Sequence, residues 1–205
     1  MTKPFPAVAA IEFQDIPSGI FATDAMLKKA PVAFVKSGSI TRGRFLTLIG
    51  GSTASVDEAY EEGRFHGADA ISDHVFLPDI APPVFDAIFN KRHIQPDHPL
   101  AILETTSVPV LIRAAEAAVK GTPVHIAEIR LADHGLAGKG LLLLQGELHD
   151  IEAALEIAHA WTARHTHGHA TSRILSRPHE ALLRHLQQGT TFSNVQGLHM
   201  EGETC

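Results

Sequence analysis

The sequence has almost no cysteine and no long apolar run. The only cysteine among 205 residues is Cys205, at the last position, so no disulfide can form within the chain. Apolar runs such as Gly140–Leu144 are strand-sized, whereas a membrane-spanning helix needs ~20 residues. The first eight residues also lack the apolar core of an export signal. These absences predict a protein of the reducing cytoplasm that has no membrane partner.

An excess of basic residues is missing as well. The chain has 17 Lys and Arg against 23 Asp and Glu, for a net charge of -6. Nucleic-acid-binding surfaces are usually built on a basic excess, so we expect no nucleic-acid partner. The 14 histidines are unusual, and their protonation would make the net charge positive. Solubility and association should therefore depend on pH near 6.

Signatures of common enzyme classes are also missing. The sequence has no Gly-rich phosphate loop, no HExxH motif and no Gly-x-Ser-x-Gly elbow. The terminal position of Cys205 argues against Cys–His catalysis. We therefore expect no enzyme, although acid–base chemistry on one of the many histidines stays an open alternative.

The chain contains an internal repeat that indicates a tandem duplication. Three pairs of matching residues lie 92 positions apart: Glu12 and Glu104, Lys28 and Lys120, and Pro31 and Pro123. The segment 43–51 matches 138–146 at a separation of 95, which places a three-residue insertion in one loop. Further along, Leu77-Pro78 matches Arg177-Pro178 at a separation of 100. We predict a first domain over 1–92, a second over 93–189 and a polar tail over 190–205.

Each copy has the same predicted order of strands and helices. Apolar patterning in the first copy predicts strands over 8–13, 32–40, 44–49 and 71–77, and helices over 18–29 and 56–66. Ser18 is the expected cap of the first helix. In the second copy we expect strands over 100–105, 124–131, 140–145 and 170–176, and helices over 108–120 and 149–164, with a final helix from Pro178 to about Gln188. The order β-α-β-β-α-β predicts an α+β, ferredoxin-like fold in each half.

The repeated motifs resemble a known family. The carrying segments are 24–30 (DAMLKKA), 41–51 (TRGRFLTLIGG) and 176–181 (SRPHEA), within a resemblance that spans roughly 7–189. The sequence is similar to tandem-domain bacterial microcompartment (BMC) shell proteins of the trimer-forming, single-layer type. The resemblance implies two BMC domains per chain and a flat pseudohexamer of three chains. It also implies a place in the shell of a microcompartment in the bacterial cytoplasm, beside other shell proteins.

In the resembled family, a loop between the two central strands faces a pore on the symmetry axis. This implies a pore lined by Ser39, Ile40, Thr41, Arg42 and Gly43, through which small metabolites pass. Three copies of Arg42 would attract anions. A plain hairpin turn, with Gly43 present for backbone freedom, is the alternative reading of the same residues. The longer second-copy loop brings His134, Gly135 and Leu136 to the same pore or folds away from it.

The family also implies contacts at the edge of the flat assembly. Lys28 and Lys120 end the first helix of each copy, and Arg177 precedes a proline; all three are expected at this edge. A lysine stem can lie flat on a neighbour while its ammonium finds carbonyl groups. The alternative for each lysine is a solvated side chain that favours the carboxyl end of a helix.

Cofactors are not expected. Some similar proteins hold an iron–sulfur cluster on a cysteine of the pore loop, but this chain has Thr41 there, which offers no thiolate. The run His165, His167 and His169 is a weak candidate for zinc or nickel, and a surface role for it is favoured. A small-ligand or metal-binding regulator on a duplicated ferredoxin-like fold is the alternative function.

Overall fold

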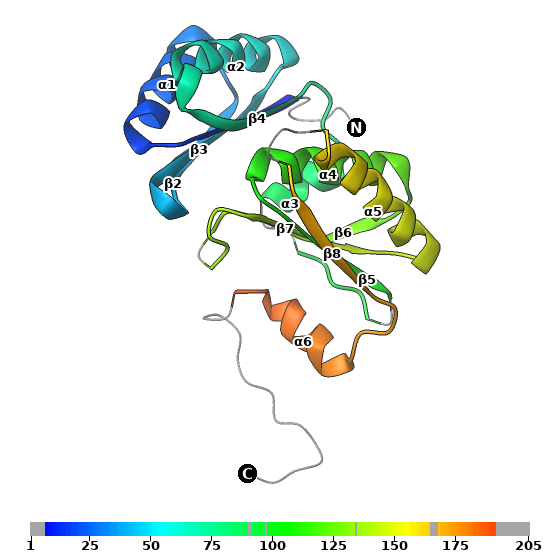
Figure 1. Ribbon diagram of the computed structural model, residues 1–205. Coiled ribbons are helices and arrows are strands. Elements are labelled where there is room, and N and C mark those ends of the chain that lie inside the picture. Colours follow the sequence, from blue (N-terminus) through cyan, green and yellow to red (C-terminus); the bar gives the residue numbers. More distant parts are fainter. Residues whose placement is uncertain (1–6, 90–91, 97, 134, 165–167, 192–205) are drawn as a thin grey trace.

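The chain folds into two α+β domains of the same topology. The structure is a computed structural model that describes residues 7–89, 92–96, 98–133, 135–164 and 168–191. Each domain has a four-stranded antiparallel sheet with two helices on one face (Figure 1). No helix within the described ranges is long and apolar enough to cross a bilayer.

The first domain follows the predicted β-α-β-β-α-β order. Its elements are β1 (Ala7–Phe13), α1 (Ile16–Lys29), β2 (Phe34–Ile40), β3 (Arg44–Gly51), α2 (Thr53–Gly67) and β4 (Ile71–Leu77). The strands lie in the order β2-β3-β1-β4, with every neighbouring pair antiparallel. A short helix, α3 (Pro82–Ile88), then leads towards the second domain.

The second domain repeats this arrangement. Its elements are β5 (Leu100–Thr105), α4 (Val108–Gly121), β6 (His125–Leu131), β7 (Gly140–Gln145), α5 (Leu148–Thr162) and β8 (Ala170–Leu175). The strand order is β6-β7-β5-β8. The last helix, α6 (Glu180–Gln188), lies beside the second domain (Figure 1), and its buried Leu183 clusters with Leu100 of β5 and Leu143 of β7. The predicted α+β fold is thus confirmed: three of the strands match their predicted bounds, and the other boundaries differ by at most three residues.

One predicted cap is wrong. Helix α1 begins at Ile16, and the side chain of Asp15 accepts a hydrogen bond from the backbone N–H of Ser18 at 2.8 Å. Ser18 therefore lies in the first turn and Asp15 is the N-cap, because Pro17 fits this turn and lacks an N–H group that would need a partner. In the second domain Ser107 caps α4 in the same way, through the N–H of Val110.

The strand register corrects the separation of 100 between the ends of the two copies. Val8 lies opposite Leu77 in the first sheet, and the equivalent Leu100 lies opposite Leu175 in the second. Leu77 thus corresponds to Leu175, a separation of 98, and α3 and α6 begin at the same separation. The counterpart of Arg177 is therefore Asp79 rather than Leu77. Matching Pro78 with Pro178 predicted a correspondence between the two copies that the register of the strands contradicts.

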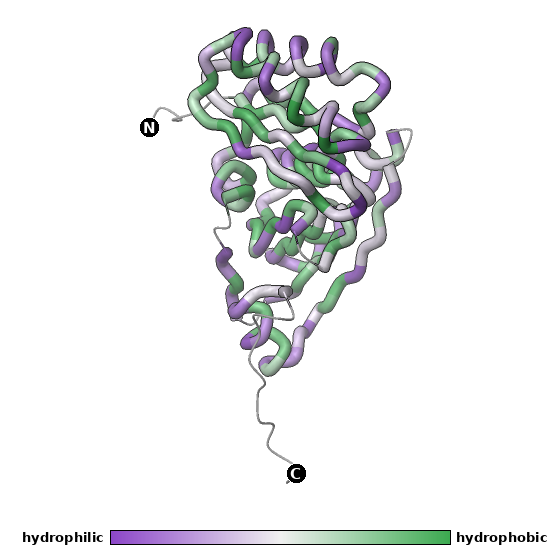
Figure 2. Tube along the Cα trace, turned by 90° about the vertical axis from the view of Figure 1, so that its left-hand side faces the viewer, coloured by the Kyte–Doolittle hydropathy of each residue, from purple (hydrophilic) through white to green (hydrophobic). Residues whose placement is uncertain are grey.

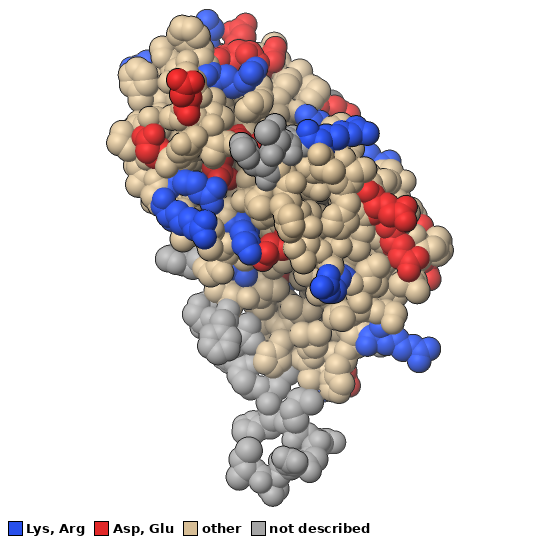
Figure 3. Space-filling view, in the orientation of Figure 1, with Lys and Arg blue, Asp and Glu red and all other residues tan. Residues whose placement is uncertain are grey.

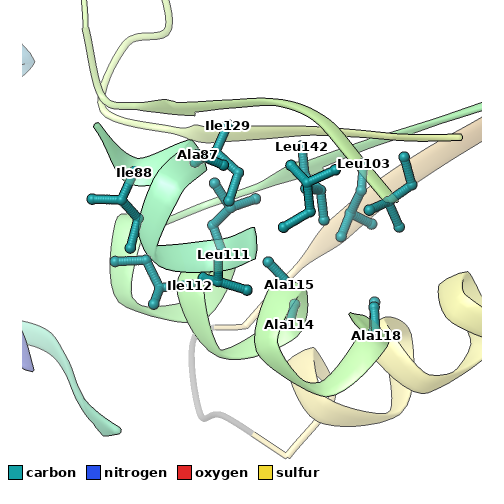
Figure 4. Close-up of a cluster of buried hydrophobic side chains, with 14 of the residues drawn as sticks. Ala87, Ile88, Leu103, Leu111, Ile112, Ala114, Ala115, Ala118, Ile129 and Leu142 are labelled. Carbon is teal, nitrogen blue, oxygen red and sulfur yellow. The ribbon is translucent and has the colours of Figure 1, made fainter. Parts of the chain in front are cut away.

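A large apolar core joins the two domains. It contains Leu48 and Val75 from the first sheet, Val84 and Ile88 from α3, and many residues of the second domain. Figure 4 shows Ala87 and Ile88 of α3 beside Leu111 and Ile112 of α4. Apolar residues concentrate on the strands and on the inward sides of the helices (Figure 2). This shared core fixes the relative placement of the two halves of the chain.

Candidate pore loop and contact surfaces

The proposed pore loop is the tip of the β2–β3 hairpin. Ile40 pairs with Arg44 across the hairpin, and residues 41–43 form a single 3-10 turn between them. Arg42 and Gly43 have φ angles of 68° and 71°, a left-handed conformation that glycine adopts without cost. Ser39, Thr41, Arg42 and Gly43 are exposed and Ile40 is half-buried. Basic side chains gather over this tip in Figure 3. The loop is thus free to meet other molecules.

The corresponding loop of the second domain packs against the first domain. Gly138, at a φ of 83°, lies so close to the Arg44 guanidinium that a side chain there would overlap it. Gly135 is exposed, while the side chain of Leu136 is buried in the loop. His134 lies outside the described residues. The end of this loop at Gly138 therefore packs against Arg44. The side chain of Leu136 does not reach the surface.

A small pocket that opens to solvent lies between the hairpin and the second domain. Its volume is about 250 Å³, and its walls include Ser39 and Ile40 from the hairpin and Leu131 and Asp133 from the second domain. Lys36 and Ser37 lie on the same wall. The two loops expected at the pore are thus neighbours within one chain.

A buried ion pair anchors the hairpin to the junction of the domains. The Glu12 carboxylate binds the Arg44 guanidinium and also accepts a hydrogen bond from the N–H of Val108, the first residue of α4, at 3.3 Å. Burial raises the pKa of Glu12, and the positive charge of Arg44 opposes that rise. Because the partial positive charge of a helix N-terminus favours a carboxylate, Glu12 holds α4 against β1. The match between Glu12 and Glu104 in the repeat did not predict that Glu12 contacts Arg44 and Val108.

The junction has further polar contacts along α4. The Glu116 carboxylate accepts hydrogen bonds from the N–H of Ala81, the N-cap of α3, at 3.0 and 3.1 Å. Arg113 donates to the carbonyl oxygen of Phe76 at 3.1 Å. The Ser107 hydroxyl donates to the Asp73 carboxylate. We call the contact of β1, β4 and α3 with α4 and β6 the in-chain interface.

The two predicted edge lysines lie in different surroundings. Lys28 is exposed and pairs with Asp24 of its own helix at 2.5 Å. Lys120 donates to the carbonyl oxygen of Asp79 at 2.6 Å and pairs with Glu116 at 2.6 Å. Each lysine thus pairs with the acid four residues before it, but only Lys120 reaches the neighbouring domain. Arg177 is exposed in the segment between β8 and α6.

The histidine run is only partly visible. His165 and His167 lie outside the described residues. His169 is exposed, and its carbonyl oxygen accepts a hydrogen bond from the N–H of Thr106 at 3.2 Å. Within the described part of the chain, no group of three or more His, Cys, Asp or Glu side chains is placed to hold a metal ion. The metal hypothesis therefore has no structural support in that part of the chain.

Comparisons with known proteins agree with this architecture. The family model described as "BMC domain" matches twice, over residues 7–80 and 100–178. The chain is 31% identical over 183 residues to the bacterial microcompartment shell protein PduT of Citrobacter freundii, which covers 89% of this chain and 98% of that protein. The fold is also that of a microcompartment protein from Desulfitobacterium hafniense DCB, with a TM-score of 0.75, 30% identity, and coverage of 87% of this chain and 98% of that one.

A more distant structure supports the fold alone. It is a fused, permuted hexameric shell protein of the RMM microcompartment, with a TM-score of 0.55, 22% identity, and coverage of 77% of this chain and 81% of that chain. The two domain matches together span most of the chain, and each coincides with one copy of the repeat. The chain therefore belongs to the BMC-domain family of bacterial microcompartment shell proteins, of which it carries two fused domains.

Proposed function

We propose that three copies of this chain form a flat pseudohexameric tile of a microcompartment shell, with a pore on its threefold axis. A chain with two BMC domains supplies two sixths of such a ring, so three chains close it. The observation that carries the proposal is the exposed tip of the β2–β3 hairpin, residues 39–43, in a chain of this family. The family is structural rather than catalytic, and we assign the chain no catalytic role.

The chemistry of the hairpin tip favours passage of small anionic metabolites. Thr41 and Arg42 are both exposed, and three chains would bring three guanidinium groups and three hydroxyl groups to one opening. A ring of arginines raises the local concentration of anions, and hydroxyl groups replace some of their water contacts. Gly135, in the neighbouring loop, belongs to the rim of the same opening.

The first test is the mass of the protein in solution, by light scattering after size exclusion. The proposal expects three chains of 22.1 kDa in one particle. A monomer or a dimer at micromolar concentration would refute the pore, because no threefold axis would then exist.

The edge assignment has its own test. Lys28, Lys120 and Arg177 are proposed to contact neighbouring tiles and other shell proteins. Changing Lys28→Ala and Lys120→Ala together should leave the trimer intact and weaken the growth of extended sheets seen by electron microscopy. Unaltered sheets from this double variant would refute the edge assignment.

We also propose that the tile holds no iron–sulfur cluster. Thr41 occupies the tip of the hairpin, and its hydroxyl group is not a ligand that such clusters use. Thr41→Cys should then create a site for a cluster on the axis, visible as absorbance after anaerobic reconstitution. If the trimeric variant gains no absorbance, Thr41 does not face the axis.

A further inference from the structure

The segment that runs from α3 to β5 is bonded to the second sheet through its backbone. The N–H of His93 donates to the carbonyl oxygen of Ala127 at 3.0 Å. Ala127 stands at a register shift of β6, and a bulged residue of this kind is left unpaired in the ladder. The carboxamide of Gln145 accepts the N–H of Gln95 at 2.8 Å and donates to its carbonyl oxygen at 2.9 Å. The segment is therefore attached to both β6 and β7.

An apolar contact reinforces this attachment. Ile94 is buried and clusters with Leu143 of β7 and Leu183 of α6. We call residues 92–98 the strap; Asp97 within it lies outside the described residues. The strap is thus packed as a part of the second domain, although it is also the covalent link between the two domains.

Three imidazole rings gather where the strap is attached. His125, the first residue of β6, has its ring centroid 6.5 Å from that of His93 and 6.3 Å from that of His98. Its Nε2 lies 3.4 Å from the same Gln145 oxygen that accepts the strap N–H. His93 is exposed, and the other two histidines are half-buried. One ring of the cluster therefore belongs to the sheet and two belong to the strap.

The surroundings of the cluster disfavour positive charge. Burial lowers the pKa of His125; the hydrogen bond to Gln145 opposes this shift, and the charges of His98 and His93 add to it. The next charged groups along the strap, Arg92 and Glu128, pair with each other at 2.9 Å. No carboxylate of the described chain pairs with any of the three rings. Protonation of the cluster therefore places like charges side by side without a counter-ion.

We propose that the strap is an acid-operated latch: protonation of the three histidines releases it from β6 and β7 while both sheets stay folded. The strap separates because His93 and His98 move with it and His125 stays on the sheet, so opening relieves the repulsion. For two unit charges 6.3–6.5 Å apart, the repulsion changes an equilibrium roughly threefold at the dielectric constant of water. At an effective dielectric constant of about 20, the change is roughly 80-fold.

The first domain has no titrating group at the corresponding position. Gln145 is equivalent to Gly50, and the residue opposite Gly50 in the register is Phe34 rather than a histidine. The Phe34 ring lies so close to Gly50 that a side chain there would overlap it. The first sheet thus closes this position with an apolar contact. The latch is confined to the link between the domains, which makes this link sensitive to pH in the range where histidine titrates.

Hydrogen exchange measured by mass spectrometry follows the opening of the strap. The reporters are the N–H groups of His93 and Gln95, which are bonded to the sheet in the closed strap. Exchange at pH 7.5 and at pH 5.5 is divided by the rate of an unstructured peptide of the same sequence, which gives a protection factor at each pH. The protection of the wild-type strap should fall about tenfold at pH 5.5, between the two limits of the repulsion. Strands β1 and β3 should stay equally protected at both pH values.

A double variant tests whether the strap histidines cause this fall. His93→Gln combined with His98→Gln removes both charges from the strap and leaves His125 in place. Its protection at pH 5.5 should stay within about twofold of that at pH 7.5, because one charged ring has no like charge to repel it. His149→Gln is the matched control: the His149 side chain on α5 is 80% exposed and lies outside the cluster, so this variant should lose protection as the wild type does. Circular dichroism checks that each variant is folded.

Three results would overturn the latch. The first is a wild-type strap that is equally protected at both pH values. The second is a double variant that loses protection as the wild type does, because another group would then drive the opening. The third is an equal fall of protection in β1 and β3, because the whole chain would then unfold in acid. Each is read from exchange within a chain, so a failure of the latch leaves the proposed trimer standing.

Discussion

Replacing Arg44 with methionine would leave the buried carboxylate of Glu12 without its cation. The Glu12 side chain is fully buried and that of Arg44 is 19% exposed, so solvent screens the pair weakly. Removing one partner of a buried ion pair costs about 3–5 kcal/mol of unfolding free energy. Arg64→Met is the matched control, because Arg64 and Glu61 form an exposed pair on α2, where the loss should stay below about 1 kcal/mol.

The loss should also depend on pH in a defined direction. Burial already raises the pKa of Glu12 above its ordinary value of 4.5, and without Arg44 it rises further. A carboxyl group with a raised folded-state pKa contributes stability that is present below pH 4.5 and lost as the pH rises through the folded pKa. The deficit of Arg44→Met relative to the wild type should therefore be larger at pH 7.5 than at pH 5.

Denaturant-induced unfolding measures both effects. All variants are compared at one protein concentration, because unfolding of an assembled protein depends on concentration. A loss for Arg44→Met no larger than that for Arg64→Met would refute the role given to the buried pair. A deficit that does not change with pH would refute the reasoning about Glu12.

Two other perturbations follow from the structure. Burial lowers the pKa of His125, and the hydrogen bond that its ring donates to the side-chain oxygen of Gln145 acts against this shift. The unfolding free energy should therefore fall as the pH drops below 6.5, and His125→Gln should weaken this dependence in denaturant titrations at pH 7.5 and 5.5. Gly138→Ala should lower the unfolding free energy by about 1–3 kcal/mol, because it combines a positive φ with overlap on Arg44. Gly135→Ala has the positive φ but open space around it, so thermal melts should show a smaller loss; equal losses would contradict the overlap.

Local patterns in the sequence were enough to predict the elements and the hairpin. Helices and strands differ in the spacing of their apolar residues. Because the sequence repeats, each element could be predicted twice, once from each copy. The short polar segment 41–43 predicted the turn at the hairpin tip, which the structure confirms. The cap of α1 was wrong because Asp15 and Ser18 are both good cap residues, and only the backbone geometry distinguishes them.

The assembly surfaces could not be predicted in the same way. Ile20 and Ile112 are the same residue in the same motif, so nothing local distinguishes the exposed Ile20 from the buried Ile112. Their difference depends on β4 and α3, which pack against only one of the two helices. The contact between Glu12 and Val108 likewise joins residues far apart in sequence. Burial of this kind is a property of the folded chain and its neighbours.

The shared core between the two domains has a consequence for the energetics of ring closure. Six separate domains would each lose translational and rotational freedom on joining a ring, whereas three fused pairs lose it only three times. Every second domain–domain contact around the ring then joins two domains of the same chain. Its formation does not depend on protein concentration, because the chain holds the two domains together. Dilution should therefore open the ring only at alternate contacts, releasing two-domain units that can close again without refolding.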